Sequence, residues 1–432
     1  MDNKNMDQLL ATLLNLKESE IKEVLSTTDQ NGKHCFYVFL ARSKKAFCDL
    51  CGSCTDVVSN GYYCRKAIVS DQAFDGSDVF LKVPRYVCRS CHHSFSDDKH
   101  MTPRGKQISY DVIIKVMEIL KSPHMTFKEA ARLTGISESS VVRIFDEHCH
   151  IPRCSFPEAV CIDEMYAPNS AYHESDYVCV FYDFMRHTII DVLPSRTKNY
   201  LHHYFQNLQG SDELNNVKYV VMDMHYPYKQ IAQLYMKKAA ICADSFHVVK
   251  ALNDSLSKLR IRIMKRYDTD SKEYYLLKNW RFLLFKRNTN LDNKGKYNKK
   301  LGKYANYRQI LDDMLSIDPD LDKAWHLKER YMEFNVNATY EDAEDQLEEL
   351  INAFIQANIP KYEQFTTMLC HWKQEIINSF QEYHGRRLNN SVAESINSQI
   401  SQLLLNTRGI RNVERRRKRI MYAINKTGFI LK

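Results

Sequence analysis

The sequence predicts a multidomain protein of the α+β class. At 432 residues the chain is too long for one ordinary domain core, so we expect several domains. Two C-x-x-C pairs in the first hundred residues predict a zinc-ribbon module, and a glycine-joined pair of short helices after them predicts a helix-turn-helix domain. Short apolar strands then alternate with helices, which predicts a mixed α/β core that a large helical insertion interrupts.

Composition narrows the class of protein and its compartment. Hydrophobic residues make up 44% of the chain and charged residues 26%, as is typical of a globular protein. The net charge of +8, with clustered basic residues, favours a polyanionic partner. We expect no membrane partner, because no apolar run has membrane-spanning length. The N-terminus lacks the layout of a secretory signal, and the odd number of cysteines, thirteen, is typical of reduced thiols, so we expect a cytoplasmic protein.

The four cysteines of the C-x-x-C pairs predict a structural zinc site. Cys48 and Cys51 form one pair, and Cys88 and Cys91 form the other. Each pair can present two thiolates to one tetrahedral Zn²⁺, and the β-rich runs between the pairs predict a hairpin that brings them together. Four protein ligands leave no open position, so the metal would fold the module rather than catalyse. The long spacing between the pairs leaves alternative ligands open: Cys54, Cys64, His92 and His93.

A helix-turn-helix pattern follows an apolar helix that Pro123 closes. Thr126 can cap a first short helix, Gly135 makes the turn, and Ser137 can cap a second helix. We expect the second helix to turn three apolar residues inward: Val141, Val142 and Ile144. Its outward face would carry the candidate DNA-binding residues, which are Ser137, Ser139, Ser140 and Arg143, together with Glu138. A plain helical hairpin is the alternative.

The alternating segment predicts a mixed sheet with helices on its faces. The runs EAVCIDEMY, DYVCVFYDF and HTIIDVLP predict three adjacent strands; NVKYVVMDMH and KKAAICAD predict two more, each after a helix. Functional groups gather where the strands of such sheets end, and Asp163 and Asp223 follow apolar runs. A single aspartate there is usually a turn or cap residue, and Asp183, Asp191 and Asp244 are rivals by the same reasoning.

The run NNSVAESINSQI allows two interpretations of Glu394. Ser391 and Glu394 have the S-x-x-E spacing of a capping box, in which Glu394 only helps to begin a helix. Alternatively, Glu394 points a carboxylate from the first turn of that helix at a metal ion. The run by itself does not decide between the two.

The segment from Ser245 to about Gln381 has a helical and polar pattern. Its basic stretches, including NKGKYNKKLGKYANYR, interleave with Trp280, Tyr297 and Tyr304, which favours phosphate contact over a merely solvated surface. The stretch YEDAEDQLEELI is acidic and is expected to be a solvated helix face. The tail, TRGIRNVERRRKRI, is either a nucleic-acid patch or a charged helix face.

Four motifs in order, VCIDEM, VVMDMHYPY, ADSFHVVK and NNSVAESIN, resemble those of D-D-E transposases with a ribonuclease H-like catalytic core. More narrowly, the chain resembles the ISL-three family of bacterial insertion-sequence transposases from about Cys48 to about Arg411. The resemblance implies that Asp163, Asp223 and Glu394 are catalytic acids that hold Mg²⁺ or Mn²⁺. Asp244 and His247 match a recurrent family motif and are possible accessory residues. Family members often have glycine where this chain has Ser395.

The resemblance also implies what the protein does. We expect a transposase that binds the terminal inverted repeats of its element as a homo-oligomer and cuts and joins DNA with the help of divalent metal ions. The alternatives are a DNA-binding regulator descended from a transposase, which would not need the three acids together, and a nuclease on the same core, which would not join ends.

The expected domain boundaries follow the changes of pattern. The lead-in spans residues 1–40, the zinc ribbon 41–100, the helix-turn-helix domain 105–152, the ribonuclease H-like core 157–250 and 382–410, the helical insertion 251–381, and the basic tail 411–432.

Overall fold

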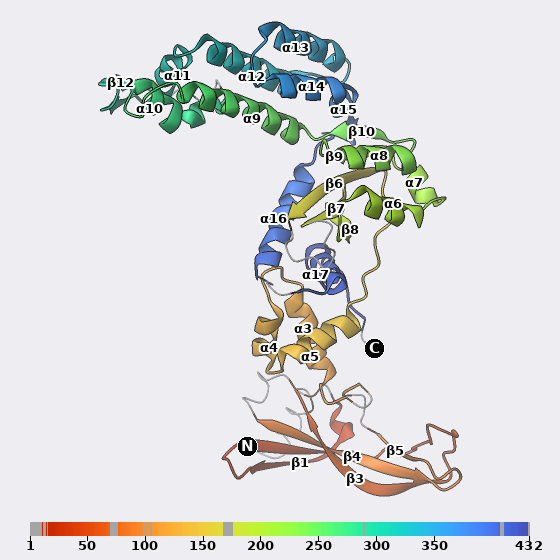
Figure 1. Ribbon diagram of the computed structural model, residues 1–432. Helices are drawn as coiled ribbons and strands as arrows, with labels where there is room; N and C mark the ends of the chain where they lie inside the picture. The colour runs from red at the N-terminus through yellow and green to blue at the C-terminus, as the bar shows by residue number, and fades with distance from the viewer. Residues whose placement is uncertain are drawn as a thin grey trace. The chain divides into compact units, whose positions relative to one another are not determined.

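The chain forms two compact units in the computed structural model (Figure 1). The terminal unit consists of Met1–Pro152 with Gln399–Lys432, and the central unit consists of Arg153–Ser398. The structure describes residues 11, 14, 16–69, 77–97, 101–103, 106–166, 176–287, 291, 293–406 and 410–430, so the first ten residues of the expected lead-in lie outside it. No helix among these residues is both long enough and apolar enough to cross a membrane.

A five-stranded sheet occupies the N-terminal part of the terminal unit. Its strands are β1 (Ile21–Thr28), β2 (His34–Leu40), β3 (Val57–Ala67), β4 (Asp78–Cys88) and β5 (Ser94–Ser96), after a short 3-10 helix at Glu18–Glu20. The strand order is β1-β2-β4-β3, and β5 pairs with β4. Alternate residues of β4, Val79, Leu81 and Val83, are buried, as the period of a strand requires. Because β2 pairs with β4, the sheet joins strands of the expected lead-in, residues 1–40, to strands of the expected zinc ribbon, residues 41–100.

Three helices follow the sheet: α3 (Tyr110–Leu120), α4 (Phe127–Thr134) and α5 (Glu138–His148). The Thr126 hydroxyl accepts the Glu129 N–H at 2.9 Å and begins α4, and the Ser137 hydroxyl accepts the Ser140 N–H at 3.2 Å and begins α5. Gly135 ends α4 with a φ of 68°, a left-handed conformation that glycine adopts without strain. The two short helices and the glycine turn expected from the sequence are therefore present. One detail differs, because Val142 is only half-buried and Phe145 fills the core instead.

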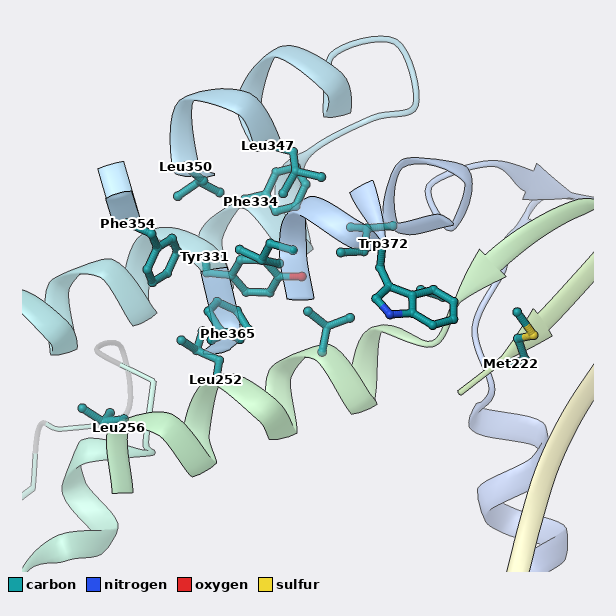
Figure 2. Close-up of a cluster of buried hydrophobic side chains, with 14 of the residues drawn as sticks. Met222, Leu252, Leu256, Tyr331, Phe334, Leu347, Leu350, Phe354, Phe365 and Trp372 are labelled. Carbon is teal, nitrogen blue, oxygen red and sulfur yellow. The ribbon is translucent and has the colours of Figure 1, made fainter. Parts of the chain in front are cut away.

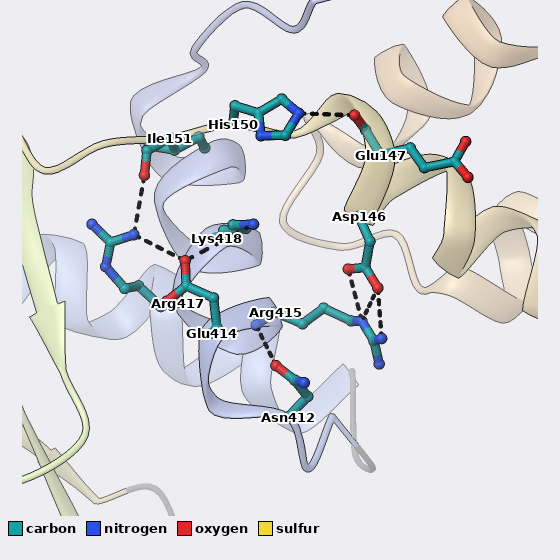
Figure 3. A network of polar contacts seen from close by, with 9 residues as sticks. All are labelled: Asp146, Glu147, His150, Ile151, Asn412, Glu414, Arg415, Arg417 and Lys418. Carbon is teal, nitrogen blue, oxygen red and sulfur yellow. Dashed lines mark hydrogen bonds and ion pairs between the residues drawn. The ribbon is translucent and has the colours of Figure 1, made fainter. Parts of the chain in front are cut away.

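The basic tail is a structural helix of the terminal unit, α17 (Val413–Asn425). The fully buried Arg419 donates to the carbonyls of Ser122 and Met125 at 2.9 and 2.8 Å. These carbonyls lie in the connection between α3 and α4, outside both helices. The Arg415 guanidinium also holds the Asp146 carboxylate of α5 through two nitrogens (Figure 3). Much of the basic character of α17 therefore serves packing against α3 and α5.

The central unit contains a second five-stranded sheet. Its strands are β6 (Ala159–Tyr166), β7 (Tyr177–Asp183), β8 (Thr188–Leu193), β9 (Tyr219–Met222) and β10 (Ala240–Ala243), with α6 (Lys198–Gln206), α7 (Asp212–Asn215) and α8 (Tyr226–Tyr235) between them. The strand order is β10-β9-β6-β7-β8; β9 is parallel to β6 and β10, whereas β7 is antiparallel to β6 and β8. These strands are nearly continuous buried apolar runs, as expected where helices cover both faces of a sheet.

The rest of the central unit is mostly helical. Its helices are α9 (Ser245–Met264), α10 (Lys272–Asn279), α11 (Tyr307–Leu315), α12 (Pro319–Asn337), α13 (Ala343–Ala357), α14 (Glu363–His371) and α15 (Lys373–Asn378), with a 3-10 turn at Arg281–Leu284. Leu252 of α9, Tyr331 of α12 and Phe365 of α14 belong to one buried cluster (Figure 2). The same cluster includes Met222 of β9, so the helical part and the sheet share a continuous core.

Two short hairpins depart from the helical expectation. β11 (Lys296–Asn298) pairs with β12 (Lys303–Ala305), and β13 (Glu382–Tyr383) pairs with β14 (Arg386–Arg387). The helical interpretation of NKGKYNKKLGKYANYR is therefore wrong at its centre. Asn298 accepts the N–H groups of Lys300 and Leu301, and Gly302 takes a φ of 70°, so the chain turns back at this point. After the second hairpin, α16 (Ser391–Asn406) begins in the central unit and continues into the terminal unit.

Candidate active site and metal centres

The four cysteine sulfurs expected to bind zinc lie together in the terminal unit. Cys48 Sγ is 3.6 Å from Cys91 Sγ, Cys51 Sγ is 3.6 Å from Cys88 Sγ, and all four lie within 4.8 Å of one another. Tetrahedral Zn²⁺ with bonds of about 2.3 Å separates its sulfur ligands by about 3.8 Å, so the group fits this ion. The backbone N–H of Cys91 lowers the pKa of the Cys88 thiol to about 7, whereas, against the lowering effect of the His93 N–H, burial and the neighbouring sulfurs raise the pKa of Cys91 to about 12. Four thiolates so close together therefore require a cation among them.

The hairpin β3–β4 assembles this group. Val57 of β3 lies opposite Cys88 of β4, so the two C-x-x-C turns meet at one end of the hairpin. The alternative ligands do not join the sulfurs: His93 Nε2 is instead 2.9 Å from the Asp49 carboxylate. Cys54 and Cys64, both exposed, are likewise outside the group found among the described residues.

Three aspartates follow registered positions on three parallel strands of the central sheet. The residues that lie opposite one another on β6, β9 and β10 are Ile162, Met222 and Ala243. The next residue on each strand path is an aspartate: Asp163, Asp223 and Asp244. The parallel pairing therefore brings together side chains that are far apart in sequence. Asp163 itself lies inside β6 rather than at its end, because pairing with β7 continues to Tyr166.

His247 from the first turn of α9 completes the cluster. Its Nδ1 is 2.5 Å from Asp223 Oδ1, and its Nε2 is 3.8 Å from Asp244 Oδ2. Asp244 is the N-cap of α9 and accepts the Phe246 N–H at 3.4 Å, which fixes the start of that helix. One ligand atom from each of Asp163, Asp223 and His247 lies within 4.8 Å of the others. The residues of the recurrent family motif thus lie beside the two aspartates expected to be catalytic.

The electrostatics of this cluster favour a cation. Burial, with the nearby Asp223 carboxylate, raises the pKa of Asp163 to about 7. Burial also raises the pKa of Asp244, which is only 1% exposed. His247 is partly desolvated, which lowers its pKa, but its bond to Asp223 and the other carboxylates outweigh this and raise it. A divalent cation would relieve this concentration of buried acid groups, and carboxylate oxygens suit Mg²⁺ and Mn²⁺.

Two further residues of the site were missed by sequence reasoning. Asn397 of α16 donates its amide N–H to Asp163 Oδ2 at 2.8 Å, and the Tyr182 hydroxyl of β7 donates to the Asn397 side-chain oxygen. Asn390 is fully buried and donates its backbone N–H to Asp244 Oδ1 at 3.3 Å. Its own side-chain atoms, like Asp244 Oδ2, have no hydrogen-bond partner among the described residues. The spacing of Asn397, one helical turn after Glu394, could have predicted that it lies on the same side of the helix as that candidate acid.

Glu394 is exposed and is not in the cluster around Asp163. It lies in the first turn of α16, three residues before Asn397, and residues at this spacing share a helix face. Because Asn397 touches Asp163, Glu394 projects from the part of α16 next to the acid cluster. The capping box with Ser391 does not form: α16 begins at Ser391, whose N–H donates to the Asn389 side chain at 3.1 Å.

The rival aspartates have local structural roles. Asp183 Oδ1 accepts the N–H groups of Met185 and Arg186 at 2.9 and 2.8 Å, and so shapes the turn between β7 and β8. Asp191 accepts the Tyr204 hydroxyl at 2.8 Å. Neither joins the potential metal cluster of the described residues.

The second of the two short helices, α5, presents a polar surface. Ser137, Glu138, Ser139 and Arg143 are exposed, and Ser140 is half-buried. On the next turn of the same face, Glu147 pairs with Lys106 at 3.2 Å. The candidate DNA-binding side chains of α5 are therefore available at the surface of the terminal unit.

Comparison with known protein families gives one clear match. A family model described as a transposase, of the ISL-three type, matches residues 160–420. This range exceeds half of the chain and contains the aspartate cluster, His247, Glu394 and Asn397. No curated protein matches the chain significantly. Members of such a family act on DNA and use a divalent metal ion. The chain therefore belongs to the ISL-three family of transposases.

Proposed function

We propose that this transposase cuts DNA at the ends of its element and joins the freed ends to a target, with Asp163, Asp223 and Glu394 as the catalytic acids. The observation that carries the proposal is the convergence of Asp163 and Asp223, 60 residues apart in sequence, on adjacent parallel strands. If β6 to β10 are numbered 1 to 5 along the chain, their order across the sheet is 3-2-1-4-5. Strands 1, 2 and 3 are antiparallel neighbours, and strands 4 and 5 run parallel to strand 1. This order supports a ribonuclease H-like core.

The acid cluster would hold Mg²⁺ or Mn²⁺. When bound, such ions activate the attacking oxygen and stabilise the leaving oxygen of an in-line displacement at phosphorus. Asp163 and Asp223 would supply carboxylate oxygens, and Glu394 would supply a third from α16. Asn397 positions Asp163, because its amide N–H holds Oδ2 at 2.8 Å while the Glu164 N–H holds Oδ1 at 2.7 Å, and together these two bonds fix the plane of the carboxylate. His247 positions Asp223 in the same manner.

DNA recognition would belong to the terminal unit. Ser137, Ser139, Ser140 and Arg143 of α5 would read the terminal inverted repeats, and structural Zn²⁺ on the four cysteines would hold the β3–β4 hairpin. Because α17 packs against α3 and α5, this recognition domain would require residues 399–432 as well as 105–152. We further propose a homo-oligomer on DNA, since two element ends must be processed together.

The test is an end-cleavage and strand-transfer assay on duplexes that carry the terminal repeats. Asp163→Ala and Asp223→Ala should abolish both reactions and leave end binding intact, whereas Asp183→Ala should retain chemistry because the Asp183 carboxylate accepts the N–H groups of its own turn and does not join the acid cluster of the described residues. Loss of activity in Asp183→Ala with activity retained in Asp163→Ala would overturn the assignment. Cleavage without joining by the parent protein would indicate a nuclease instead.

A further inference from the structure

A hollow of about 780 Å³ lies beside the β11–β12 hairpin, in the helical part of the central unit. Its volume is in the range of sites that hold nucleotide-sized ligands. Figure 1 shows β12 at the end of the helical part farthest from β10, and the 20-residue α9 between them is about 30 Å long. The hollow is therefore separate from the acid cluster.

The inner wall of the hollow is aromatic. Trp280 and Tyr307 line it with their ring centroids 6.1 Å apart, and Tyr275 lines it as well. The indole N–H of Trp280 is buried and has no hydrogen-bond partner among the described residues. An unpaired buried donor of this kind costs about 1–3 kcal/mol, so an acceptor group in the hollow would be favoured. Flat rings next to an unused donor suit a planar heterocycle with acceptor atoms.

The rim of the hollow is cationic. Lys296, Lys299 and Lys300 line it and are exposed. Lys303 of the same hairpin is paired with Asp313 at 2.7 Å, whereas the ion pairs found in the described parts of the chain include none for the three rim lysines. Their charge is therefore available to an anionic group at the mouth.

Two exposed tyrosines continue the aromatic surface from the hollow onto the hairpin: Tyr297 lines the hollow, and Tyr304 lies beside it on the next strand. Tyr297 of β11 lies opposite Tyr304 of β12, with ring centroids 5.3 Å apart. The two side chains remain 58% and 75% exposed. Cross-strand aromatic pairs stabilise hairpins, but that role does not account for the aromatic hollow and the lysine rim beside them. Sites for single-stranded nucleic acid combine aromatic rings, on which successive bases stack, with cations that bind the phosphates.

We propose that this hairpin and hollow form a binding site for an unpaired nucleotide of a DNA strand. The base enters the hollow against Trp280 and Tyr307, the neighbouring base stacks on the tyrosine pair, and the phosphates lie on the rim lysines. A base in an intact duplex cannot reach these rings, so the site selects single-stranded DNA. That the strand is DNA rests on the proposed function. The existence of the site rests only on the geometry of the hollow and the hairpin.

Photo-crosslinking of the full-length protein in magnesium-free buffer tests the site. The probe is a 16-nucleotide single strand that contains 4-thiothymidine, and mass spectrometry of the adduct locates the contact. We expect adducts on Trp280, Tyr297, Tyr304 or Tyr307. Adducts confined to other parts of the chain would overturn the proposal.

Affinity measurements on variants give the second readout. The triple change Lys296→Ala, Lys299→Ala and Lys300→Ala, combined with Tyr297→Ala, should weaken binding of the same strand at least tenfold and duplex binding less than twofold. The matched control removes three exposed lysines elsewhere in the unit, at Lys237, Lys238 and Lys323, and should leave both affinities within twofold. Equal losses in the two variants, or equal losses on duplex and single strand, would overturn the proposal.

Two further experiments ask whether the site binds a strand or a free nucleotide, and whether binding depends on the catalytic acids. Thymidine monophosphate should bind at least a hundredfold more weakly than the strand; equal affinity would overturn the proposal in favour of a free-nucleotide site. Asp163→Ala should crosslink as the parent does. If crosslinking at the hairpin failed while the parent still cleaved element ends, this inference would fall and the proposed function would stand.

Discussion

Replacing Asp163 by asparagine should stabilise the magnesium-free central unit at pH 8. Asp163 is 6% exposed, and burial raises its pKa to about 7, from about 3.8 in the unfolded chain. Between these values the folded state binds the extra proton, so this group lowers the stability of the fold as pH rises from about 4 to about 7. Above pH 7 the full cost applies, which at 1.36 kcal/mol per pH unit is about 4 kcal/mol.

The substitution also removes one acceptor. Asp163 Oδ1 accepts the Glu164 N–H at 2.7 Å and Oδ2 accepts the Asn397 amide, whereas asparagine has one oxygen for both, a loss of about 1 kcal/mol. Asp163→Asn should therefore raise the free energy of unfolding by about 3 kcal/mol at pH 8. The increase should fall below about 1 kcal/mol at pH 5, where Asp163 of the parent is protonated. Added Mg²⁺ or Mn²⁺ should reverse the order at pH 8 by stabilising the parent protein alone.

Denaturant titration followed by tryptophan fluorescence measures this effect, because Trp280, Trp325 and Trp372 all lie in the central unit. Asp183→Asn is the matched control, since the oxygen that accepts both turn N–H groups is retained, and it should unfold as the parent does at both pH values. If Asp163→Asn were no more stable than the parent at pH 8, or if its advantage grew toward pH 5, burial of the Asp163 charge would not be what destabilises the metal-free fold.

The zinc module, the DNA-binding helix and Glu394 can each be tested by substitution. Cys48→Ser or Cys88→Ser should lose about one Zn²⁺ per chain in elemental analysis and unfold the N-terminal zinc module, while the central unit, which holds all three tryptophans, keeps its fluorescence; a zinc-free parent protein would contradict this. Alanine at Ser139, Ser140 and Arg143 together, in a protein that keeps α17, should weaken terminal-repeat binding more than random-duplex binding in a gel-shift assay, and equal losses would show that these side chains do not read sequence. Glu394→Gln should melt within a few degrees of the parent and bind terminal repeats, yet neither cut nor join them, because a neutral amide cannot balance a hard cation; near-parental strand transfer would remove Glu394 from the catalytic set.

Local signals in the sequence were sufficient for the caps and turns. Thr126, Gly135 and Ser137 act within a few residues of themselves, so their roles follow from their immediate neighbours. The strand runs of the central sheet were also readable, because buried strands are continuous apolar segments. The turn at Asn298 and Gly302 carried a comparable signal, which the surrounding helical pattern obscured.

Contacts between distant segments were not readable in the same way. Nothing near Arg419 indicates that it will donate to carbonyls at the end of α3, almost 300 residues away. Likewise, the hydrogen bond from Asn397 to Asp163 depends on how α16 packs on the sheet. The family resemblance selected Asp163 and Asp223 from five similar aspartates, and the strand register explains physically why these two lie together.

A change of ligand at the aspartate cluster tests whether the chemistry depends on a metal ion held there. Cysteine at position 163 or 223 replaces a hard oxygen ligand by a soft sulfur, which Mn²⁺ accepts better than Mg²⁺ does. Asp163→Cys and Asp223→Cys should therefore fail to cleave element ends in Mg²⁺ and regain cleavage in Mn²⁺, while Asp183→Cys cleaves in both. Near-parental cleavage in Mg²⁺ by both Asp163→Cys and Asp223→Cys would show that neither carboxylate holds the catalytic metal.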